Sequence, residues 1–89
     1  MSLVQLRSFV AVAEEANVSR AARRLAISQP PVTRQIRDLE AELGVALFAR
    51  TPKGMRLLPS GEVFLRHARE ILAAVDRATR DPKLRLHGG

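Results

Sequence analysis

The stretch Ser28-Gln-Pro-Pro-Val-Thr-Arg-Gln-Ile-Arg-Asp-Leu-Glu-Ala-Glu-Leu-Gly44 predicts one helix with a defined beginning and end. Ser28 is a preferred N-cap residue type, and its side chain can accept a hydrogen bond from a free first-turn amide. Pro30 and Pro31 are tolerated there because first-turn amides have no partner inside the helix. Gly44 predicts the end, since helices commonly stop at a glycine in the left-handed conformation.

The two faces of this helix differ in chemistry. One face is an apolar stripe at helical spacing, formed by Val32, Ile36, Leu39 and Leu43. The other face begins with the polar and basic residues Gln29, Thr33, Arg34 and Arg37, and the acidic residues are confined to the C-terminal half. This asymmetry is typical of a helix that enters a DNA groove with its N-terminus first.

Composition restricts the function classes that fit this chain. A length of 89 residues corresponds to one small domain, too short for a large enclosed active site. The net charge of +6 favours a polyanionic partner, either nucleic acid or an anionic membrane. The sequence has no cysteine, no secretory signal and no apolar segment of the roughly eighteen residues that a membrane span needs. With three phenylalanines as its only aromatic residues, the chain fits duplex DNA better than single strands.

Two further helices are expected before the basic helix. The first spans Leu3 to Ala16, opens with a capping-box pattern at Ser2 and presents a broad apolar face to the core. The second is short, from about Val18 to Leu25, with Asn17 or Ser19 as its cap. A short helix, a short turn and a helix with a polar start together predict a helix-turn-helix.

A two-stranded hairpin is expected after the basic helix. The segments 45–50 and 55–58 are β-compatible, and Thr51-Pro52-Lys53-Gly54 between them has turn chemistry. An isolated turn lysine is ordinarily solvated, but beside a basic helix-turn-helix we interpret Lys53 as the tip of a wing that touches DNA. Arg50 has two equally supported roles, a phosphate contact or an ion pair with Glu40.

A long amphipathic helix is expected from Pro59 to about Thr79. Its apolar residues alternate at spacings of four and three, the heptad pattern of a helix that pairs with a second copy of itself. The predicted dimer interface comprises Phe64, Leu65, Ala68, Ile71, Leu72, Val75 and Ala78. The alternative is a helix that folds back on its own core. Pro82 is expected to stop the helix, and 84–86 to begin a strand.

The sequence lacks the residue patterns that catalysis or metal binding requires. His67 and His87 have no matched acids or thiols, and two histidines fall short of the usual metal ligand count. No glycine-rich phosphate loop is present, the serines have no histidine or aspartate pattern nearby, and no two acids form a catalytic pair. We therefore expect neither a metal site nor an enzyme.

One pattern of spaced residues resembles the N-terminal domain of LysR-type transcriptional regulators. It reads Ala21-Ala22-x-x-Leu25-x-x-Ser28-Gln29-Pro30-x-x-Thr33-x-x-Ile36-x-x-Leu39-Glu40-x-x-Leu43-Gly44-x-x-Leu47-Phe48-x-Arg50, and the similarity extends from about Leu3 to Ala78. The resemblance implies a mainly α fold, in which three helices and a two-stranded wing form a winged helix-turn-helix over residues 1–58. It further implies a dimerising linker helix over 59–80 and, at 81–89, the start of a missing effector-binding domain.

The resemblance also implies a function. The chain is expected to be the DNA-binding fragment of a bacterial, cytoplasmic regulator that binds a double-stranded operator as a homodimer or tetramer. A small-molecule inducer is implied for the absent C-terminal domain, and no cofactor is expected in this fragment. One departure concerns Leu58, where the family commonly has a threonine that caps the linker helix. Ser60 is expected to take over as the cap, which shifts the helix start by about two residues.

Residue roles follow from position in the pattern and from the chemistry of base recognition. Base contacts are expected from Gln29, Pro30, Pro31, Thr33 and Arg34, with Arg34 directed to guanine and Gln29 to adenine or a phosphate. Backbone or minor-groove contacts are expected from Ser28, Arg37, Arg50, Lys53, Arg20 and Arg23. The competing hypothesis is an interaction module that dimerises through the last helix and whose arginines serve solubility or membrane-surface binding. A membrane-binding patch, however, requires neither a Ser-Gln-Pro start nor a wing.

Overall fold

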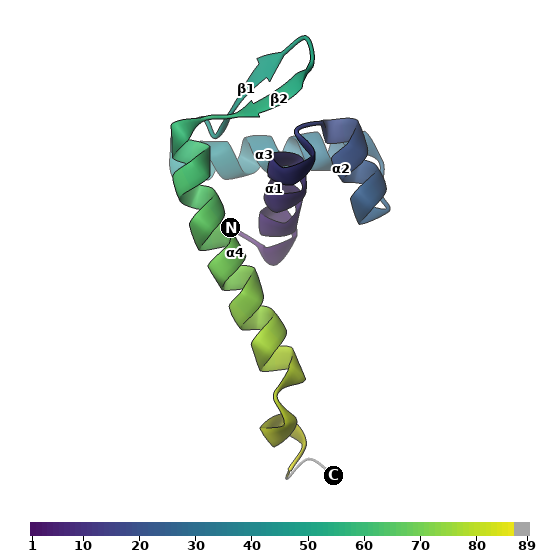
Figure 1. The fold of residues 1–89 in the computed structure, drawn as a ribbon, viewed down its shortest axis with the longest axis vertical. Coiled ribbons are helices and arrows are strands. Elements are labelled where there is room, and N and C mark those ends of the chain that lie inside the picture. The colour runs from purple at the N-terminus through teal and green to yellow at the C-terminus, as the bar shows by residue number, and fades with distance from the viewer. Residues whose placement is uncertain (87–89) are drawn as a thin grey trace.

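The computed structural model describes residues 1–86. Within them the chain forms α1 (Leu3–Glu15), α2 (Val18–Leu25), α3 (Gln29–Leu43), β1 (Phe48–Thr51), β2 (Gly54–Leu57), α4 (Pro59–Arg80) and a 3-10 helix, η1 (Pro82–Arg85). Helices α1, α2 and α3 and the hairpin form a head, and α4 extends away from it on the side opposite the hairpin (Figure 1). Among residues 1–86, none of the helices combines the length and the apolar composition that a membrane span requires.

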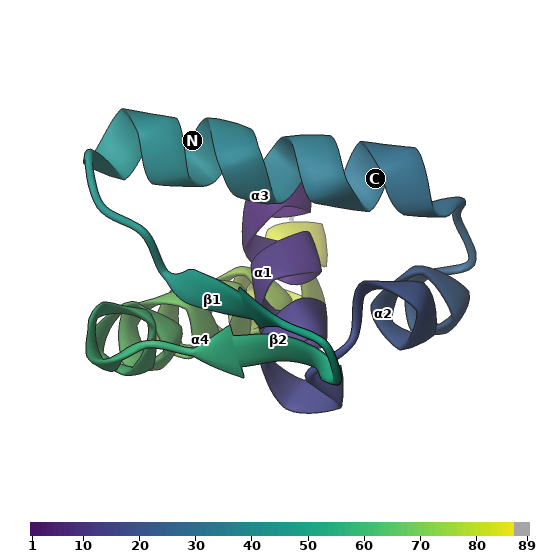
Figure 2. The same ribbon diagram turned by 90° about the horizontal axis from the view of Figure 1, so that it is seen from above.

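Helix α1 lies at the centre of the head, with α2 on one side and α4 on the other (Figure 2). Its Phe9 is fully buried and contacts two other phenylalanine rings, Phe48 of β1 at 5.4 Å and Phe64 of α4 at 5.1 Å between ring centroids. The apolar stripe of α3 buries Val32 and Leu39 completely in the same core. The core therefore joins the helix-turn-helix, the hairpin and the first turns of α4 into one body.

The predicted ends of the helices are largely confirmed. Ser2 and Gln5 form both hydrogen bonds of the capping box. Asn17, and not Ser19, caps α2, because its side-chain oxygen accepts a hydrogen bond from the Arg20 amide at 2.9 Å. Gly44 ends α3 in the left-handed conformation, with φ of 70°.

Ser28 has the backbone conformation of an N-cap residue, but its side chain makes no capping hydrogen bond. An N-cap oxygen accepts from the amide two or three positions further on. Pro30 and Pro31 occupy both positions, and proline has no amide hydrogen. The expected capping bond was therefore wrong, because the prolines that the first turn tolerates also remove its donors.

The hairpin is confirmed, although its first strand begins later than expected. Thr51 pairs with Gly54, so Pro52 and Lys53 form the turn. The Leu47 amide donates to the Glu40 carboxylate at 2.7 Å, and the Leu47 carbonyl accepts from the Leu58 amide at 2.9 Å. The segment before Phe48 thus takes its hydrogen bonds from other elements instead of extending the strand.

The hairpin is attached to the end of α1 by one close backbone contact. The Met55 amide donates to the Ala16 carbonyl at 3.1 Å. Gly54 has φ of 140°, and a Cβ placed there would lie 2.4 Å from the same carbonyl oxygen. Only glycine satisfies both the backbone angle and the close approach.

Helix α4 begins at Pro59, with Leu58 in the N-cap position and no side-chain cap. The expected shift of the helix start to Ser60 was therefore wrong. The Ser60 hydroxyl donates instead to the Ala46 carbonyl at 2.5 Å and ties the first turn of α4 to the segment before β1.

The first half of α4 packs on the chain's own core, as the fold-back alternative anticipated. Ala68 is fully buried, and Phe64, Leu65 and Leu72 are partly buried against the core. Ala68 therefore has no exposed surface for a partner, which corrects the predicted dimer interface at this position. Phe64 packs against Phe9 and stays half-buried. Ile71 and Ala78 are exposed and Val75 is half-buried, so apolar surface remains further along the helix, in addition to the exposed Val63 near its start.

The expected strand at 84–86 was also wrong. Helix α4 ends at Arg80 before Pro82, as predicted, but the chain then turns into η1, where the Asp81 side chain accepts from the Lys83 amide at 2.9 Å. No strand of the described residues is available to pair with this segment. His87 lies outside the described residues.

Candidate nucleic-acid interface

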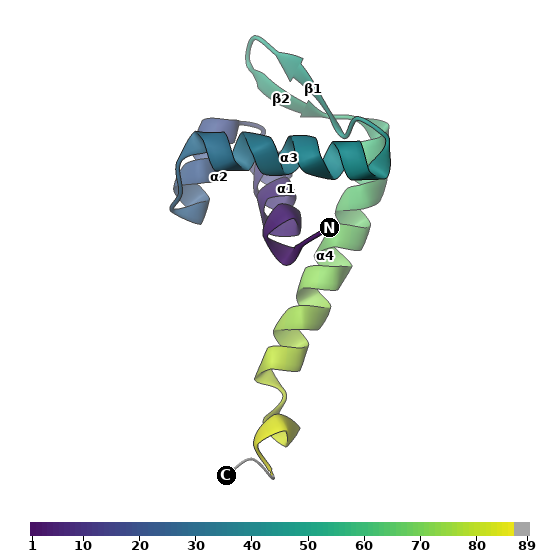
Figure 3. The same cartoon turned by 180° about the vertical axis from the view of Figure 1, so that it is seen from behind.

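The predicted reading residues lie on an outer face of the head, at the N-terminal half of α3. Seen from behind, α3 crosses in front of α1 (Figure 3). Gln29, Pro30 and Arg34 are exposed, whereas Pro31 and Thr33 are half-buried. Because the opposite stripe of α3 is buried in the core, this polar face is directed outward.

Helix α3 is also held by a polar contact with α1. The hydroxyl of Ser8, a residue with only 1% of its surface exposed, donates a hydrogen bond to the side-chain oxygen of Gln35. No sequence pattern predicts this pair, because the two residues are 27 positions apart and neither belongs to a local motif. The bond restrains the rotation of α3 and so the direction of its outer face.

The wing and the start of α3 border one open groove of about 340 Å³. Gln29, Arg50 and Lys53 line it, together with Asn17 and Ser19 from the start of α2. The fold therefore brings the first reading residue and the wing tip to the same hollow. The sequence predicts only capping roles for Asn17 and Ser19, and nothing in the local sequence indicates that they border this groove.

Arg50 lies on the side of the hairpin that faces α3. It pairs with Met55, and both line a second hollow with Thr33, Arg37 and Glu40. No ion pair joins Arg50 to Glu40 within residues 1–86. The Glu40 carboxylate instead accepts from the Leu47 and Phe48 amides, at 2.7 and 3.3 Å. The ion-pair alternative for Arg50 is thus wrong: backbone amides hold one oxygen of that carboxylate, and no ion pair within residues 1–86 joins it to Arg50.

The predicted contact cations remain unneutralised within the described part of the chain. The ion pairs there engage Arg24, Arg69, Arg80 and the N-terminal amino group. None of these groups belongs to the predicted site. The basic side chains of the predicted site are exposed and make no ion pair within residues 1–86, namely Arg20, Arg23, Arg34, Arg37, Arg50 and Lys53. Such a set of free cations on one small head favours a polyanion as partner.

Comparison with known proteins identifies the family to which this arrangement corresponds. Residues 3–62 match the bacterial regulatory helix-turn-helix protein, lysR family. HTH-type transcriptional regulator TfdS of Cupriavidus pinatubonensis is 57% identical over 82 residues, which cover 88% of this chain and 28% of the relative. ClcR of Pseudomonas putida is 58% identical over 72 residues, covering 81% of this chain and 24% of the relative. The chain thus spans less than a third of the length of these relatives.

Two solved structures resemble the whole head together with α4. The crystal structure of a CbnR_DBD–DNA complex has a TM-score of 0.89 at 45% identity, covering 94% of this chain and 97% of that one. The BenM_DBD/catB site 1 DNA complex has a TM-score of 0.90 at 40% identity and covers both chains fully. The expected mainly α, winged helix-turn-helix fold is confirmed.

Proposed function

The chain belongs to the LysR family of bacterial regulatory helix-turn-helix proteins, and we propose that it binds double-stranded DNA in a sequence-specific manner. The observation that carries this proposal is the outer face of α3, which exposes polar and basic side chains beside a basic wing and leaves them without ion pairs. Two structures similar over nearly the whole chain are complexes with DNA. The relatives are transcriptional regulators, which supports a binding function for this chain.

Base recognition is assigned to the first two turns of α3 in the major groove. Arg34 is exposed and suits guanine, whose O6 and N7 accept a bidentate guanidinium. Gln29 suits adenine or an adjacent phosphate, and Thr33 offers a methyl group to thymine. Pro30 and Pro31 add apolar edges, and by removing two amides they leave the Ser28 hydroxyl uncommitted for a phosphate.

Backbone contacts are assigned to the cations around this face. Arg37 and Arg50 lie beside the reading residues, and Lys53 at the wing tip is placed for the adjacent minor groove. Arg20 and Arg23 extend the basic surface along α2. These contacts position the domain on the duplex without reading its sequence.

The proposed unit of recognition is a dimer. Residues 1–58 form the DNA-binding head and 59–80 the linker helix, whose exposed or half-buried apolar residues Leu65, Ile71, Leu72, Val75 and Ala78 are available for a second copy. Val63 joins this set, since it is 49% exposed. In the proposed regulator, residues 81–89 lead to a C-terminal domain that binds a small-molecule inducer. The whole regulator is proposed to act in the cytoplasm.

Selection of bound sites from a random pool of duplex DNA, using this chain, tests the proposal. We expect enrichment of two related half-sites whose centres lie about one helical turn, or a multiple of it, apart. Anionic vesicles serve as the comparison, and binding to them should be weaker than binding to selected duplex at the same ionic strength. Equal binding to vesicles and duplex, with no enriched sequence, contradicts the proposal.

A further inference from the structure

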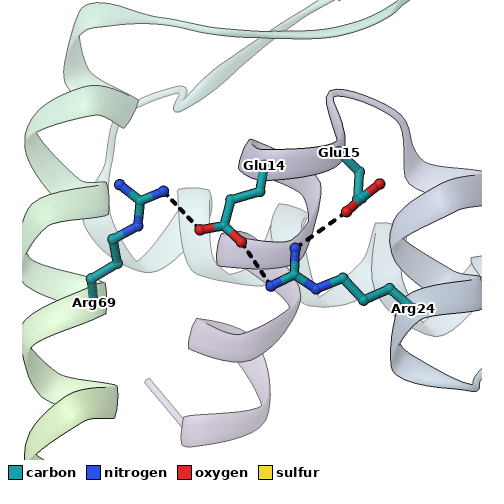
Figure 4. A network of polar contacts seen from close by, with 4 residues as sticks. All are labelled: Glu14, Glu15, Arg24 and Arg69. Atoms are coloured by element: carbon teal, nitrogen blue, oxygen red, sulfur yellow. Dashed lines mark hydrogen bonds and ion pairs between the residues drawn. The ribbon is translucent and has the colours of Figure 1, made fainter.

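Glu14, near the end of α1, joins the helices on either side of it (Figure 4). One carboxylate oxygen lies 2.7 Å from Nη2 of Arg24 on α2, and the other lies 2.7 Å from Nη2 of Arg69 on α4. Arg24 also contacts the Glu15 carboxylate at 3.3 Å. Two acids and two arginines thus form a neutral group. The hydrogen bonds from Arg69 and Arg24 lower the pKa of the Glu14 carboxyl below its ordinary value.

The position of this group in the fold matters, because α2 and α4 lie on opposite sides of α1 (Figures 1 and 2). Among the ion pairs of residues 1–86, Glu14 is the one acid that contacts two helices other than its own. It therefore connects the helix-turn-helix directly to the linker helix.

Helix α4 packs against the head around a small residue, Ala68, and beyond Leu72 it projects away from the head. Ala68 is fully buried, and Leu72 is the last residue of α4 that packs against the core. A methyl group allows close approach of two helices but offers little side-chain surface to resist a change in their crossing angle. Arg69 follows Ala68 directly and adds a polar restraint beside this crossing. Its ion pair with Glu14 is placed to limit rocking of α4 on α1.

We propose that Glu14 is a positioning residue that sets the tilt of α4 on the head and thereby the spacing of the two half-sites that a dimer accepts. The inference rests on the proposed function, because it requires two DNA-binding heads joined through α4. With its 22 residues, α4 is about 33 Å long. Because α4 is held at Ala68, about 18 Å of it projects from there to Arg80, and a tilt change of about 10° moves the far end by roughly 3 Å, close to the step of about 3.4 Å between base pairs.

The ion pairs of Glu14 can affect the tilt of α4 without being needed for folding. The Glu14 and Arg69 side chains are 32% and 53% exposed, and exposed ion pairs contribute little to the free energy of unfolding. The apolar contacts of Phe64 and Ala68 keep α4 on the head when the ion pair is removed. A variant at Glu14 should therefore fold and retain its reading face.

The test compares Glu14→Gln with Arg69→Gln and with the control Glu15→Gln. Glu15→Gln removes the same charge from the neighbouring position and breaks a contact with Arg24, but Glu15 makes no contact with Arg69. Each protein is titrated against duplexes with one selected half-site and against duplexes with two half-sites, whose separation changes by one base pair at a time. The measured quantity is the ratio of affinities between the best and the neighbouring separations.

We expect Glu14→Gln and Arg69→Gln to lower this ratio at least about threefold or to move its maximum, while the affinity for a single half-site changes less than about twofold. Glu15→Gln should leave both quantities at the wild-type values. An unchanged spacing profile in Glu14→Gln overturns the inference, as does a parallel loss of single-site affinity. If the wild-type chain binds duplex DNA without any spacing preference, the inference fails alone; if it binds no DNA, the proposed function fails as well.

A distance measurement without DNA provides a second test of the same inference. The chain has no cysteine, so Ala41→Cys on α3 and Ala74→Cys on α4, both at exposed positions, accept two spin labels. Dilution with unlabelled chain isolates the distance within one molecule. We expect Glu14→Gln to broaden or shift the distribution relative to wild type and Glu15→Gln. Coincident distributions in all three proteins overturn the inference.

Discussion

The buried hydroxyl of Ser8 donates a hydrogen bond to the side-chain oxygen of Gln35, and this contact joins the centre of α1 to the recognition helix α3. Ser8 is 1% exposed and faces a core that is otherwise apolar. A polar residue is tolerated there because its partner satisfies it. The pair therefore adds one directional contact to the apolar stripe that packs α3 on the head.

Replacing Ser8 with alanine should destabilise the fold without unfolding it. The change removes one hydrogen bond and leaves the part-buried oxygen of Gln35 without its partner, at a cost of about 1–2 kcal/mol in the free energy of unfolding. Chemical denaturation measures this difference. Ser19→Ala, at a half-buried serine that makes no side-chain hydrogen bond within residues 1–86, should change the free energy by less than about 0.5 kcal/mol. Equal effects of the two changes contradict the assignment.

The two N-cap residues Asn17 and Ser28 should respond differently to alanine. Asn17 accepts a capping hydrogen bond, so Asn17→Ala should cost about 1 kcal/mol of stability. Ser28 makes no such bond because prolines occupy the donor positions, so Ser28→Ala should cost less than about 0.5 kcal/mol. Thermal unfolding of both variants in parallel decides the matter. A loss at Ser28 as large as that at Asn17 is incompatible with an uncommitted Ser28 hydroxyl.

Gly61→Ala should destabilise the protein although Gly61 lies in a helix. Replacing a helical glycine by alanine in open surroundings stabilises by roughly 0.5–1 kcal/mol. Here the added Cβ would lie 2.3 Å from the Leu47 carbonyl oxygen, so the backbone must move, at a cost of roughly 1–3 kcal/mol. The sign of the change in denaturation midpoint is the test. Increased stability contradicts the close approach of α4 to the segment before β1.

Arg34→Ala and Arg37→Ala should affect DNA binding in different ways. Loss of a base contact at Arg34 should cost about 1–3 kcal/mol on the selected site and reduce discrimination against a scrambled site. Loss of a phosphate contact at Arg37 should weaken both sites alike and lower the salt dependence of binding. Titrations on both duplexes at several salt concentrations separate the two. Uniform losses for both variants contradict the assignment of Arg34 as a reading residue.

The stabilising effect of Glu14 should depend on pH. Its pKa is lowered in the fold, first by the hydrogen bond from Arg69 and then by that from Arg24, from an ordinary value of 4.5. A carboxyl with a lowered pKa stabilises the fold above its unfolded pKa, and this stabilisation is lost as the pH falls through the folded value. The difference in melting temperature between wild type and Glu14→Gln should therefore be small but measurable at neutral pH. It should vanish in acid, whereas a constant difference contradicts the ion-pair origin.

Much of this fold could be predicted from the sequence, because helix ends and apolar periodicity depend on near neighbours. The capping box at Ser2, the left-handed stop at Gly44 and the turn at Pro52 each follow from residues within one turn of chain. The absence of a capping hydrogen bond at Ser28 was also predictable, since Pro30 and Pro31 have no amide hydrogen to donate. Such features require only local geometry.

The contacts that orient the candidate site were decided by the tertiary structure. Ser60 bonds to Ala46 instead of capping its own helix, and the Glu40 carboxylate takes backbone amides instead of Arg50. Ala68 belongs to an apolar seam whose sequence pattern fits either a dimer interface or the chain's own core. In the folded chain Ala68 is buried in its own core. The Arg69 guanidinium donates a hydrogen bond to the Glu14 carboxylate, although the two residues are 55 positions apart in the sequence. Periodicity shows that a helix has an apolar face, but only the packed chain determines which surface covers it, because several partners compete for the same face.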